Sequence, residues 1–370
     1  MSNTVRQFYQ GYSFSLGPSP ATGFQFQTGF NDVYTGANSG FNLIQNLSRV
    51  QSVTDGLSQD RTTVNQVGQL AYLSQEITTP PTVNCGVTYY VADLSNERII
   101  GFNVSGQGAL QYILDQTQAT KNAFLGLAPQ GQDAISWTGE QQVRLFSNVQ
   151  LASWSTEGSV GNIPTTTVAF QGLNYATYTG SVNQELLAID IGNNGEYVTD
   201  KRFTLPVITS GINNTVAALR PNSISVDIGD AAVGLLVADL KAQSYSVNTD
   251  LNIQPLNKLG SLFPYAIVPQ FPISVGCSVS FYYGDMITGS YKDVLCNDNP
   301  KTIRIKINNP CSSTEAVAYE IRGVKIASQS FDSQDVGSLA GIVNISYVGA
   351  VGGPTDTRVN LLMSGRNVST

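Results

Sequence analysis

The chain has 370 residues and none of them is histidine. Without imidazole it cannot build a Ser-His-Asp or Cys-His nucleophilic system, or any metal site that uses histidine. It also lacks a C-x-x-C pair, a G-x-x-x-x-G-K-[ST] loop and a G-x-G-x-x-G turn after a strand. The usual zinc and phosphate-binding motifs are therefore missing. We expect no enzymatic activity, cofactor or metal, and we assign no catalytic, cofactor-binding or metal-binding residue.

One pair of carboxylates stands against that expectation. Asp190 and Glu196 lie close enough in sequence to suggest the acid and base of a glycosidase, but nothing distinguishes them among the 26 acidic residues. The stretch between them resembles a calcium loop, yet it lacks the carboxylate spacing and the distal glutamate that such a loop needs. Asn194-Gly195 instead predicts a hairpin turn between two strands.

Charge is scarce as well. Charged residues make up 12% of the chain, and the formal net charge is −7. Residues 1–200 hold 6 basic and 14 acidic groups and residues 201–370 hold 13 and 12, so the first part carries −8 and the second +1. No basic stripe is present that could neutralise phosphates, which argues against tight nucleic-acid binding. Either the surface is simply soluble, or its acidity lets DNA pass without adhering.

Long apolar runs are absent too. No stretch of about 18 apolar residues occurs and the N-terminus carries no apolar segment, so we expect neither a membrane span nor a signal peptide. The four cysteines fit a reducing compartment. Cys85 and Cys277 are expected to be small buried hydrophobes on strands. Cys296 and Cys311 are spaced so that they could bridge across a hairpin or stay free thiols.

The abundant residues are Gly, Ser, Thr, Asn and Gln, with 15 Phe and 17 Tyr. This mixture favours short strands joined by tight turns over long, charged surface helices. Alternation of apolar and polar residues, bounded by turn residues, indicates the strands. They are predicted at residues 42–53, 82–92, 141–151, 165–171, 224–228, 275–283, 302–307, 317–321, 342–348 and 358–363.

An internal repeat organises the chain. Residues 260–283 reappear in weaker form at residues 68–91, and a constant offset of 192 residues pairs Cys85 with Cys277 without a gap. A second match, in the same order, pairs residues 149–155 with residues 324–330 at an offset of 175. We interpret the chain as one domain type used twice.

The repeat sets the domain boundaries and the fold class. We predict a mainly β protein with two tandem antiparallel β-sandwich or β-barrel domains of the same type. Residues 1–40 are interpreted either as an extended N-terminal arm that orders along a neighbour or as a loose terminus. The remaining parts are a first β domain at 41–200, a connecting segment at 201–232 and a second β domain at 233–370.

The first copy contains an insert at about residues 106–133. Apolar residues recur there at mostly helical spacing, and Gly126 and Pro129 would end a helix. The insert therefore predicts one amphipathic helix, so the first domain should contain at least one α-helix. The apolar positions are Leu110, Ile113, Leu114, Phe124 and Leu127.

Two segments of the second copy resemble the tail tube (major tail) proteins of long-tailed bacteriophages. They are Leu259-Gly-Ser-Leu-Phe-Pro-Tyr-Ala with the following Pro-x-x-Pro-Ile-Ser-Val, and Arg322-Gly-Val-Lys-Ile-Ala-Ser-Gln-Ser-Phe331. The resemblance covers most of residues 233–350 and, through the repeat, residues 41–172. The insert and the N-terminal arm depart from the family pattern, which leaves the outer surface and the number of copies per ring open.

The resemblance implies a structural protein of the virion tail, made in the bacterial host cytoplasm. Family members form stacked hexameric rings whose inner sheets enclose a lumen through which DNA is ejected. A chain with two tube domains would need three copies for a pseudo-hexamer. Its partners would be copies of itself, other tail proteins and phage DNA that passes non-specifically through the lumen.

Three further expectations follow from a ring. Strand edges left open in one copy would pair with neighbours, and closed symmetry would use them all. The −8 and +1 parts would meet across subunit boundaries, so high salt should loosen the rings. Residues 1–40 and 201–232 would reach into adjacent rings.

Two other function classes remain open at this point. One is a capsid decoration protein or another non-tube structural protein of the virion, built from the same sandwiches. The other is a carbohydrate-binding β-sandwich, in which exposed Trp137, Trp154 or a tyrosine cluster would stack on sugar rings.

Overall fold

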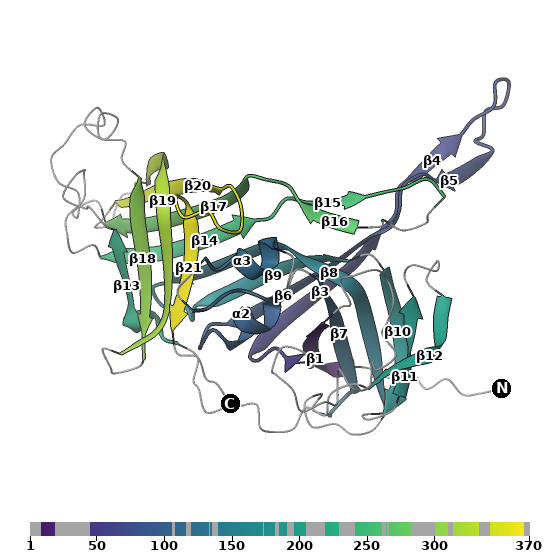
Figure 1. The fold of residues 1–370 in the computed structure, drawn as a ribbon, viewed down its shortest axis with the longest axis horizontal. Helices are drawn as coiled ribbons and strands as arrows, with labels where there is room; N and C mark the ends of the chain where they lie inside the picture. Colours follow the sequence, from purple (N-terminus) through teal and green to yellow (C-terminus); the bar gives the residue numbers. More distant parts are fainter. Residues whose placement is uncertain are drawn as a thin grey trace.

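The computed structural model is mainly β, and its paired strands are antiparallel (Figure 1). The described residues are 9–18, 45–105, 108–115, 120–132, 134, 140–172, 174–181, 185–190, 196–204, 219–228, 241–260, 264, 266–282, 300–309, 314–332 and 341–365. The predicted fold class, mainly antiparallel β with a helix in the first half, is confirmed. No helix in these ranges is long and apolar enough to cross a membrane.

Eight strands form one continuous sheet, called here the long sheet. From edge to edge they are β3 (Val50–Ser58), β6 (Thr82–Tyr90), β9 (Thr165–Gly172), β8 (Glu140–Ser159), β14 (Ala242–Asp250), β17 (Ile273–Tyr282), β20 (Ile342–Val351) and β19 (Glu315–Asp332). The strands β8 and β19 are unusually long, and only their C-terminal halves belong to this sheet.

The N-terminal halves of β8 and β19 each carry an outer sheet. On β8 lie β7 (Thr120–Pro129) and β10 (Asn174–Ser181), with β1 (Tyr9–Pro18) and β2 (Gln45–Asn46) beyond β7. On β19 lie β18 (Lys301–Asn308) and β21 (Asn360–Gly365), with β13 (Ile224–Ile228) beyond β18. Each long strand therefore links the long sheet to one outer sheet.

Short elements make up the rest of the described part of the chain. Three hairpins are β4 (Arg61–Val64) with β5 (Ser74–Ile77), β11 (Glu185–Asp190) with β12 (Glu196–Thr204), and β15 (Ile253–Leu256) with β16 (Ala266–Pro269). The β4–β5 hairpin projects away from the body of the molecule (Figure 1). The helices are α2 (Ser95–Ile100), α3 (Gln111–Leu114) and the 3-10 turn Pro221–Ser223.

One hydrophobic cluster fills the space between the long sheet and the outer elements, and it contains residues from both halves of the chain. Alternating side chains supply it: Val275, Cys277 and Val279 of β17 are each at most 2% exposed. Where the halves meet, the Trp154 ring lies between Phe102 and Tyr319, with ring centroids 5.6 Å apart in both pairs. The two halves therefore share a core rather than forming two separately packed bodies.

Twelve of the described strands fall into two sets of six that pair in the same order. In the first set β3 pairs with β6, β6 with β9, β9 with β8, and β8 with β7 and β10. In the second set β14 pairs with β17, β17 with β20, β20 with β19, and β19 with β18 and β21. The hairpin β4–β5 follows β3 as β15–β16 follows β14.

The register of the two sets also corresponds. Asp55 lies opposite Cys85 in the first set, and Val247 lies opposite Cys277 in the second; both pairs are related by the offset of 192 residues. The irregularity in β8 between Leu151 and Ser153 recurs in β19 between Ile326 and Ser328, at the offset of 175.

The two sets also share a left-handed backbone conformation at one pair of equivalent positions. Asn148 has φ of 49° and Gly323, 175 residues later, has φ of 77°. Asparagine and glycine are the residues that adopt this left-handed region most readily. A Cβ on Gly323 would lie 1.8 Å from the Arg358 carbonyl oxygen, so only glycine fits there.

Several local predictions are confirmed. The strands predicted at 82–92, 165–171, 224–228, 302–307 and 342–348 correspond to β6, β9, β13, β18 and β20. Cys85 and Cys277 are buried free thiols, each 2% exposed, and burial raises the pKa of each to about 12. Cys296 and Cys311 lie outside the described residues.

The helix predicted for the insert at 106–133 is wrong over its second half. Leu110, Ile113 and Leu114 do lie at or beside α3, but Phe124 and Leu127 belong to β7. The strand β7 lies between β1 and β8, and the side chains from Lys121 to Ala128 are buried. A strand buried on both faces shows no alternation, so its apolar residues can match helical spacing by coincidence.

The extended arm predicted at 1–40 also needs correction. Residues 9–18 form β1, which pairs along β7 of the same chain, and Phe14 and Leu16 are 1% and 2% exposed. Their alternation with Ser13 and Ser15 is a strand signal. The rest of the arm, at 1–8 and 19–40, lies outside the described residues.

The connecting segment at 201–232 is likewise folded where it is described. Residues 201–204 complete β12, and residues 224–228 form β13 in the second outer sheet. The Leu219 backbone N–H donates a 2.9 Å hydrogen bond to the Val91 carbonyl. These parts pack on their own chain, whereas residues 205–218 and 229–232 lie outside the described range.

Candidate functional surface

One face of the long sheet packs on the core, and the other, called here the polar face, carries small polar side chains. Residues directly opposite in neighbouring strands share a face, so each rung across the sheet can be followed residue by residue. One rung runs Tyr90, Thr165, Glu157, Ser246, Ser278, Ser346 and Ser328. The next runs Ser52, Thr88, Thr167, Ser155, Asn248, Gly276, Val348 and Lys325.

Hydroxyl groups on this face bond to one another. The oxygens of Thr88 and Thr167 are 3.1 Å apart, and those of Ser278 and Ser346 are 3.2 Å apart. The hydroxyls of Ser244 and Ser280 form a similar pair at 2.5 Å. Such pairs use part of the hydrogen-bonding capacity of the face within the protein. The face is therefore polar without presenting a set of converging donors to a ligand.

A hollow of about 690 Å³ lies on the polar face where β8, β14 and β17 run side by side. Its lining contains one carboxylate, Glu157, and no lysine or arginine. The described residues also contain no group of His, Cys, Asp or Glu placed to hold a metal ion. Nothing in the lining would hold a phosphate by charge.

The joint between the two strand sets is apolar and tightly held. Beside the Trp154, Phe102 and Tyr319 rings, the Tyr89 hydroxyl donates a 3.0 Å hydrogen bond to Glu97 Oε1 of α2. Glu97 is fully buried, and burial raises its pKa to about 7. The Ala109 backbone N–H also bonds the Leu361 carbonyl of β21 at 2.7 Å. The segment just before α3 is thus bonded directly to β21 of the second half.

The long sheet ends in two edges in the described part of the chain. One is the outer side of β3, which pairs on its inner side with β6. The other is the outer side of residues 325–332 of β19, whose inner side pairs with β20. Large apolar side chains are exposed at both edges: Leu57 is 53% exposed and Phe331 is 57% exposed. Among the described residues no further strand pairs with either edge, so each presents unpaired backbone groups there.

The two equivalent hairpins differ in their surroundings. The β15–β16 hairpin lies against β8, where Gln150 Nε2 donates a 2.9 Å hydrogen bond to the Ile267 carbonyl. The β4–β5 hairpin is largely exposed and carries apolar side chains in the open, including Val67, Leu70 and Tyr72. These side chains are not covered by the described part of the chain.

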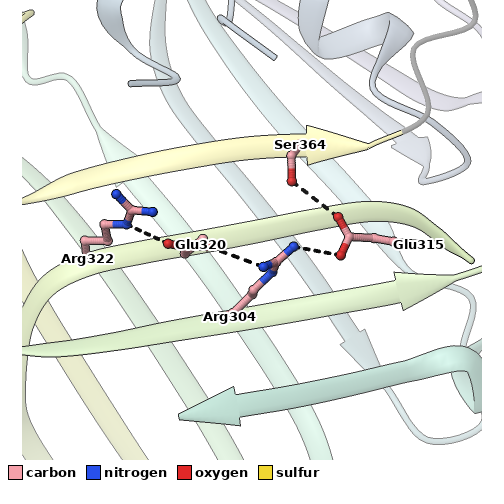
Figure 2. A network of polar contacts seen from close by, with 5 residues as sticks. All are labelled: Arg304, Glu315, Glu320, Arg322 and Ser364. Carbon is pink, nitrogen blue, oxygen red and sulfur yellow. Dashed lines mark hydrogen bonds and ion pairs between the residues drawn. The ribbon is translucent and has the colours of Figure 1, made fainter. Parts of the chain in front are cut away.

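The second outer sheet carries balanced charge on its solvent side (Figure 2). Arg304 of β18 contacts Glu315 and Glu320 of β19, with nitrogen–oxygen distances of 2.8 Å and 3.9 Å. Arg322 contacts Glu320 at 2.6 Å, and the Ser364 hydroxyl donates to Glu315 at 3.3 Å. The positive charge of Arg304 on this side of β18 is thus matched by the carboxylates of β19.

The other candidate groups have separate outcomes. Asp190 and Glu196 are directly opposite each other in the β11–β12 hairpin, as the predicted turn requires, but their side chains are outside the described part. The proposed sugar-stacking role of Trp154 is wrong, because its ring is 0% exposed in the core. Trp137 also falls outside the described residues. Sequence reasoning missed the polar face as a unit, although its signal is the serine and threonine at alternate strand positions.

The sequence matches no protein-family model and no curated protein sequence. Among solved structures, it is similar to a chain of the extracellular contractile injection system PVC sheath–tube complex in the extended state. That alignment has a TM-score of 0.28 and 14% identity, and it covers 40% of this chain and 92% of the other.

Two further solved structures align similarly. A chain of the anti-feeding prophage cap, which terminates the tube, aligns with a TM-score of 0.30 and 14% identity over 40% of this chain and 93% of that one. A chain from the tail of an empty GTA particle aligns with a TM-score of 0.23 and 8% identity over 46% and 96% of the two chains.

Proposed function

We propose that the protein is a structural subunit of a phage-type virion tail, in which copies assemble into stacked rings that form the tail tube, a conduit for DNA ejection. The observation that carries this proposal is the long sheet. One face of this sheet packs on the core. The other face carries mostly small polar side chains and no cluster of cations, and in the described part of the chain each edge lacks a further strand. Such a sheet is suited to be one segment of a closed wall.

The two strand sets are interpreted as a duplicated tube domain. Support comes from the matching order of pairing, the matching register at offsets of 192 and 175, and the matching irregularities in β8 and β19. The short sequence motifs that resemble tail tube proteins, at 259–275 and 322–331, fall in the second set. The two strand sets join edge to edge through β8 and β14.

Three copies in a ring would make a pseudo-hexamer of six tube domains. Each copy would supply eight strands, and adjacent strands are about 4.8 Å apart, so twenty-four strands span a barrel roughly 37 Å across before tilt widens it. A barrel of this size leaves an aqueous lumen, since barrels with fewer strands already do.

The polar face would line that lumen. DNA in the passage would meet mainly hydroxyl, amide and carboxylate groups, which bind phosphates weakly or repel them, and Lys325 is the cation on the two rungs described. A wall of this chemistry guides the duplex without holding it. Other tail proteins would close the ends of the tube.

The proposal is tested by electron microscopy of the purified full-length chain under negative stain. The expected result is rings or tubes with three-fold or pseudo-six-fold end views. A chain that stays monomeric over the accessible concentration range, and instead decorates purified capsids, would favour the alternative of a non-tube structural protein of the virion.

A further inference from the structure

The pairing of β8 with β14 shows how one strand set can join another at its edge. Residues 153–159 of β8 pair antiparallel with β14, and the register places Ser153 opposite Asp250 and Ser155 opposite Asn248. The hairpin that follows β14 then lies on β8 through the Gln150 hydrogen bond to the Ile267 carbonyl. This joint uses one edge of each set.

The same two kinds of edge are the ones that remain open at the ends of the long sheet. Residue numbers in β19 exceed those of the equivalent positions in β8 by 175, and those in β14 exceed the positions in β3 by 192. The C-terminal half of β19 is therefore the counterpart of the β8 edge, and β3 is the counterpart of the β14 edge. The long sheet of each copy therefore has a β8-type edge at one side and a β14-type edge at the other. These are the same two kinds of edge that pair with each other inside the chain.

We propose that β3 of one copy pairs antiparallel with residues 328–332 of β19 of a second copy, in the register of the internal joint. This inference rests on the proposed function, and it names the surfaces and the register by which the copies meet. Applying both offsets places Ser58 opposite Ser328, Leu57 opposite Gln329, Gly56 opposite Ser330 and Asp55 opposite Phe331.

The same pairing of β3 with β19 would also bring the β4–β5 hairpin into contact with the second copy. The counterpart of Gln150 is Lys325, and the counterpart of Ile267 is Gln75 in β5. The ammonium group of Lys325 takes the place of the Gln150 amide as donor to a backbone carbonyl, a charge-assisted contact. The β4–β5 hairpin of one copy then lies against β19 of the next, as β15–β16 lies against β8.

The joint between copies differs from the internal joint in its chemistry. Inside the chain, Val247 of β14 and Tyr319 of β19 belong to the apolar core. Their counterparts in the first set are Asp55, on the open edge strand β3, and Arg144, and these two form an ion pair of 2.6 Å with both side chains partly exposed. On its core side the internal joint is therefore apolar, whereas the outer joint combines this ion pair with exposed apolar side chains and is suited to assembly from separate copies.

Exposed apolar side chains at the two edges also agree with a second copy as the occupant. In the proposed register Leu57 and Phe331 lie on the core side of adjacent strands as diagonal neighbours, within reach of each other. Each is more than half exposed in the single chain. Pairing would bury both side chains, and burial of apolar surface favours contact between the two edges.

Cysteine pairs test the register directly. Ser58→Cys with Ser328→Cys, and Gly56→Cys with Ser330→Cys, place two thiols opposite each other between copies, within the Cα separation that a disulfide allows. A Cβ at Gly56 meets no atom within 4 Å, so that substitution fits the folded chain. The matched control is Ser58→Cys with Asp332→Cys, which is four residues out of register. The single variants measure the background from the native cysteines.

The readout is a non-reducing denaturing gel after mild oxidation of the assembled protein. In-register pairs are expected to convert most of the protein into covalent oligomers of up to three chains, and an equimolar mixture of the Ser58→Cys and Ser328→Cys single variants into dimers only. The out-of-register pair should stay near the background of the single variants.

The outcomes separate the two proposals. If rings or tubes form but both in-register pairs stay at background while the control cross-links, the register is wrong and the tube assignment stands. If the native chain forms no rings or tubes at all, both are overturned. Circular dichroism of each variant shows whether the β fold has been kept, and two independent in-register pairs guard against the failure of one.

Discussion

The Tyr89 hydroxyl donates a hydrogen bond of 3.0 Å to Glu97 Oε1 inside the joint between the two strand sets. The other carboxylate oxygen of Glu97 has no hydrogen-bond partner in the described part of the chain. Burial raises the pKa of Glu97 to about 7 from its ordinary value of 4.5, and the negative charge of Asp93 adds to the rise. A group whose pKa is higher in the folded state binds its proton more tightly there, so the protonated form favours folding.

The first prediction follows from the sign of that shift. Stability linked to Glu97 is fully present below about pH 4.5 and is lost as the pH rises through about 7. A shift of this size corresponds to at most roughly 3 kcal/mol at 1.36 kcal/mol per pH unit. Glu97→Gln should remove this part of the pH dependence and make the protein more stable than the native chain at pH 8.

The measurement is urea unfolding of both proteins at pH 5 and pH 8. Glu157→Gln on the polar face serves as the matched control, because that glutamate is exposed, and it should change neither midpoint appreciably. An equal loss of stability between pH 5 and pH 8 in the native chain and in Glu97→Gln would contradict the assignment.

The second prediction concerns Trp154, which is 0% exposed between Phe102 and Tyr319. Trp154→Ala leaves a large cavity at the point where the two halves share their core. The expected loss is about 3–5 kcal/mol of unfolding free energy. Chemical denaturation measures it, and Tyr12→Ala is the control, since Tyr12 is 58% exposed. A loss below about 1 kcal/mol would mean that the halves do not depend on this contact.

Much of the fold could be predicted from the sequence wherever one face of a strand is buried and the other is wet. Ile303, Ile305 and Ile307 alternate with polar residues, and all three are 0% exposed. The offset that pairs Cys85 with Cys277 also pairs β3 with β14 and β5 with β16 at the same residues.

The features that could not be predicted depend on contacts between distant segments, which the alternation of apolar and polar residues along one strand does not reveal. The strand β7 is buried on both faces by β1 and β8, so its sequence lacks a period of two. The sequence leaves Trp154 as a candidate surface aromatic, and only the partner rings, 52 residues before it and 165 after it, place it in the core. The polar face was not predicted as a surface because its members come from eight strands distributed between residues 50 and 351.

The third prediction is that ionic strength controls assembly. The Asp55–Arg144 ion pair lies at the edge that is proposed to meet a second copy, and the first and second parts of the chain carry −8 and +1. Raising salt from about 0.1 M to about 1 M shortens the Debye length from about 10 Å to about 3 Å. Rings or tubes should therefore shorten or dissociate at high salt, as measured by light scattering and microscopy.

The double variant Asp55→Asn with Arg144→Gln removes two charges of one copy from the edge that is proposed to meet the next copy, and it should make assembly less sensitive to salt. Arg322→Gln, in the ion network of the second outer sheet, is the matched control and should respond to salt like the native chain. Assembly that is indifferent to salt in the native chain would show that charge does not contribute to the joint.

The last prediction tests the polar face as the wall of a DNA passage. Ser246 and Ser278 occupy adjacent strands on one rung of that face, next to Glu157. Replacing both serines with lysine places several cations per ring around the lumen, where a phosphate backbone would pass. Each lysine that neutralises a phosphate adds about 0.9 to the slope of log affinity against log salt. Assembled tubes of the variant should therefore retain duplex DNA at about 50 mM salt and release it at about 200 mM, whereas native tubes retain none.

Thr302→Lys on the outer side of β18 is the control, because its charge faces away from the lumen. Equal DNA retention by this control and by the polar-face variant would place the passage elsewhere.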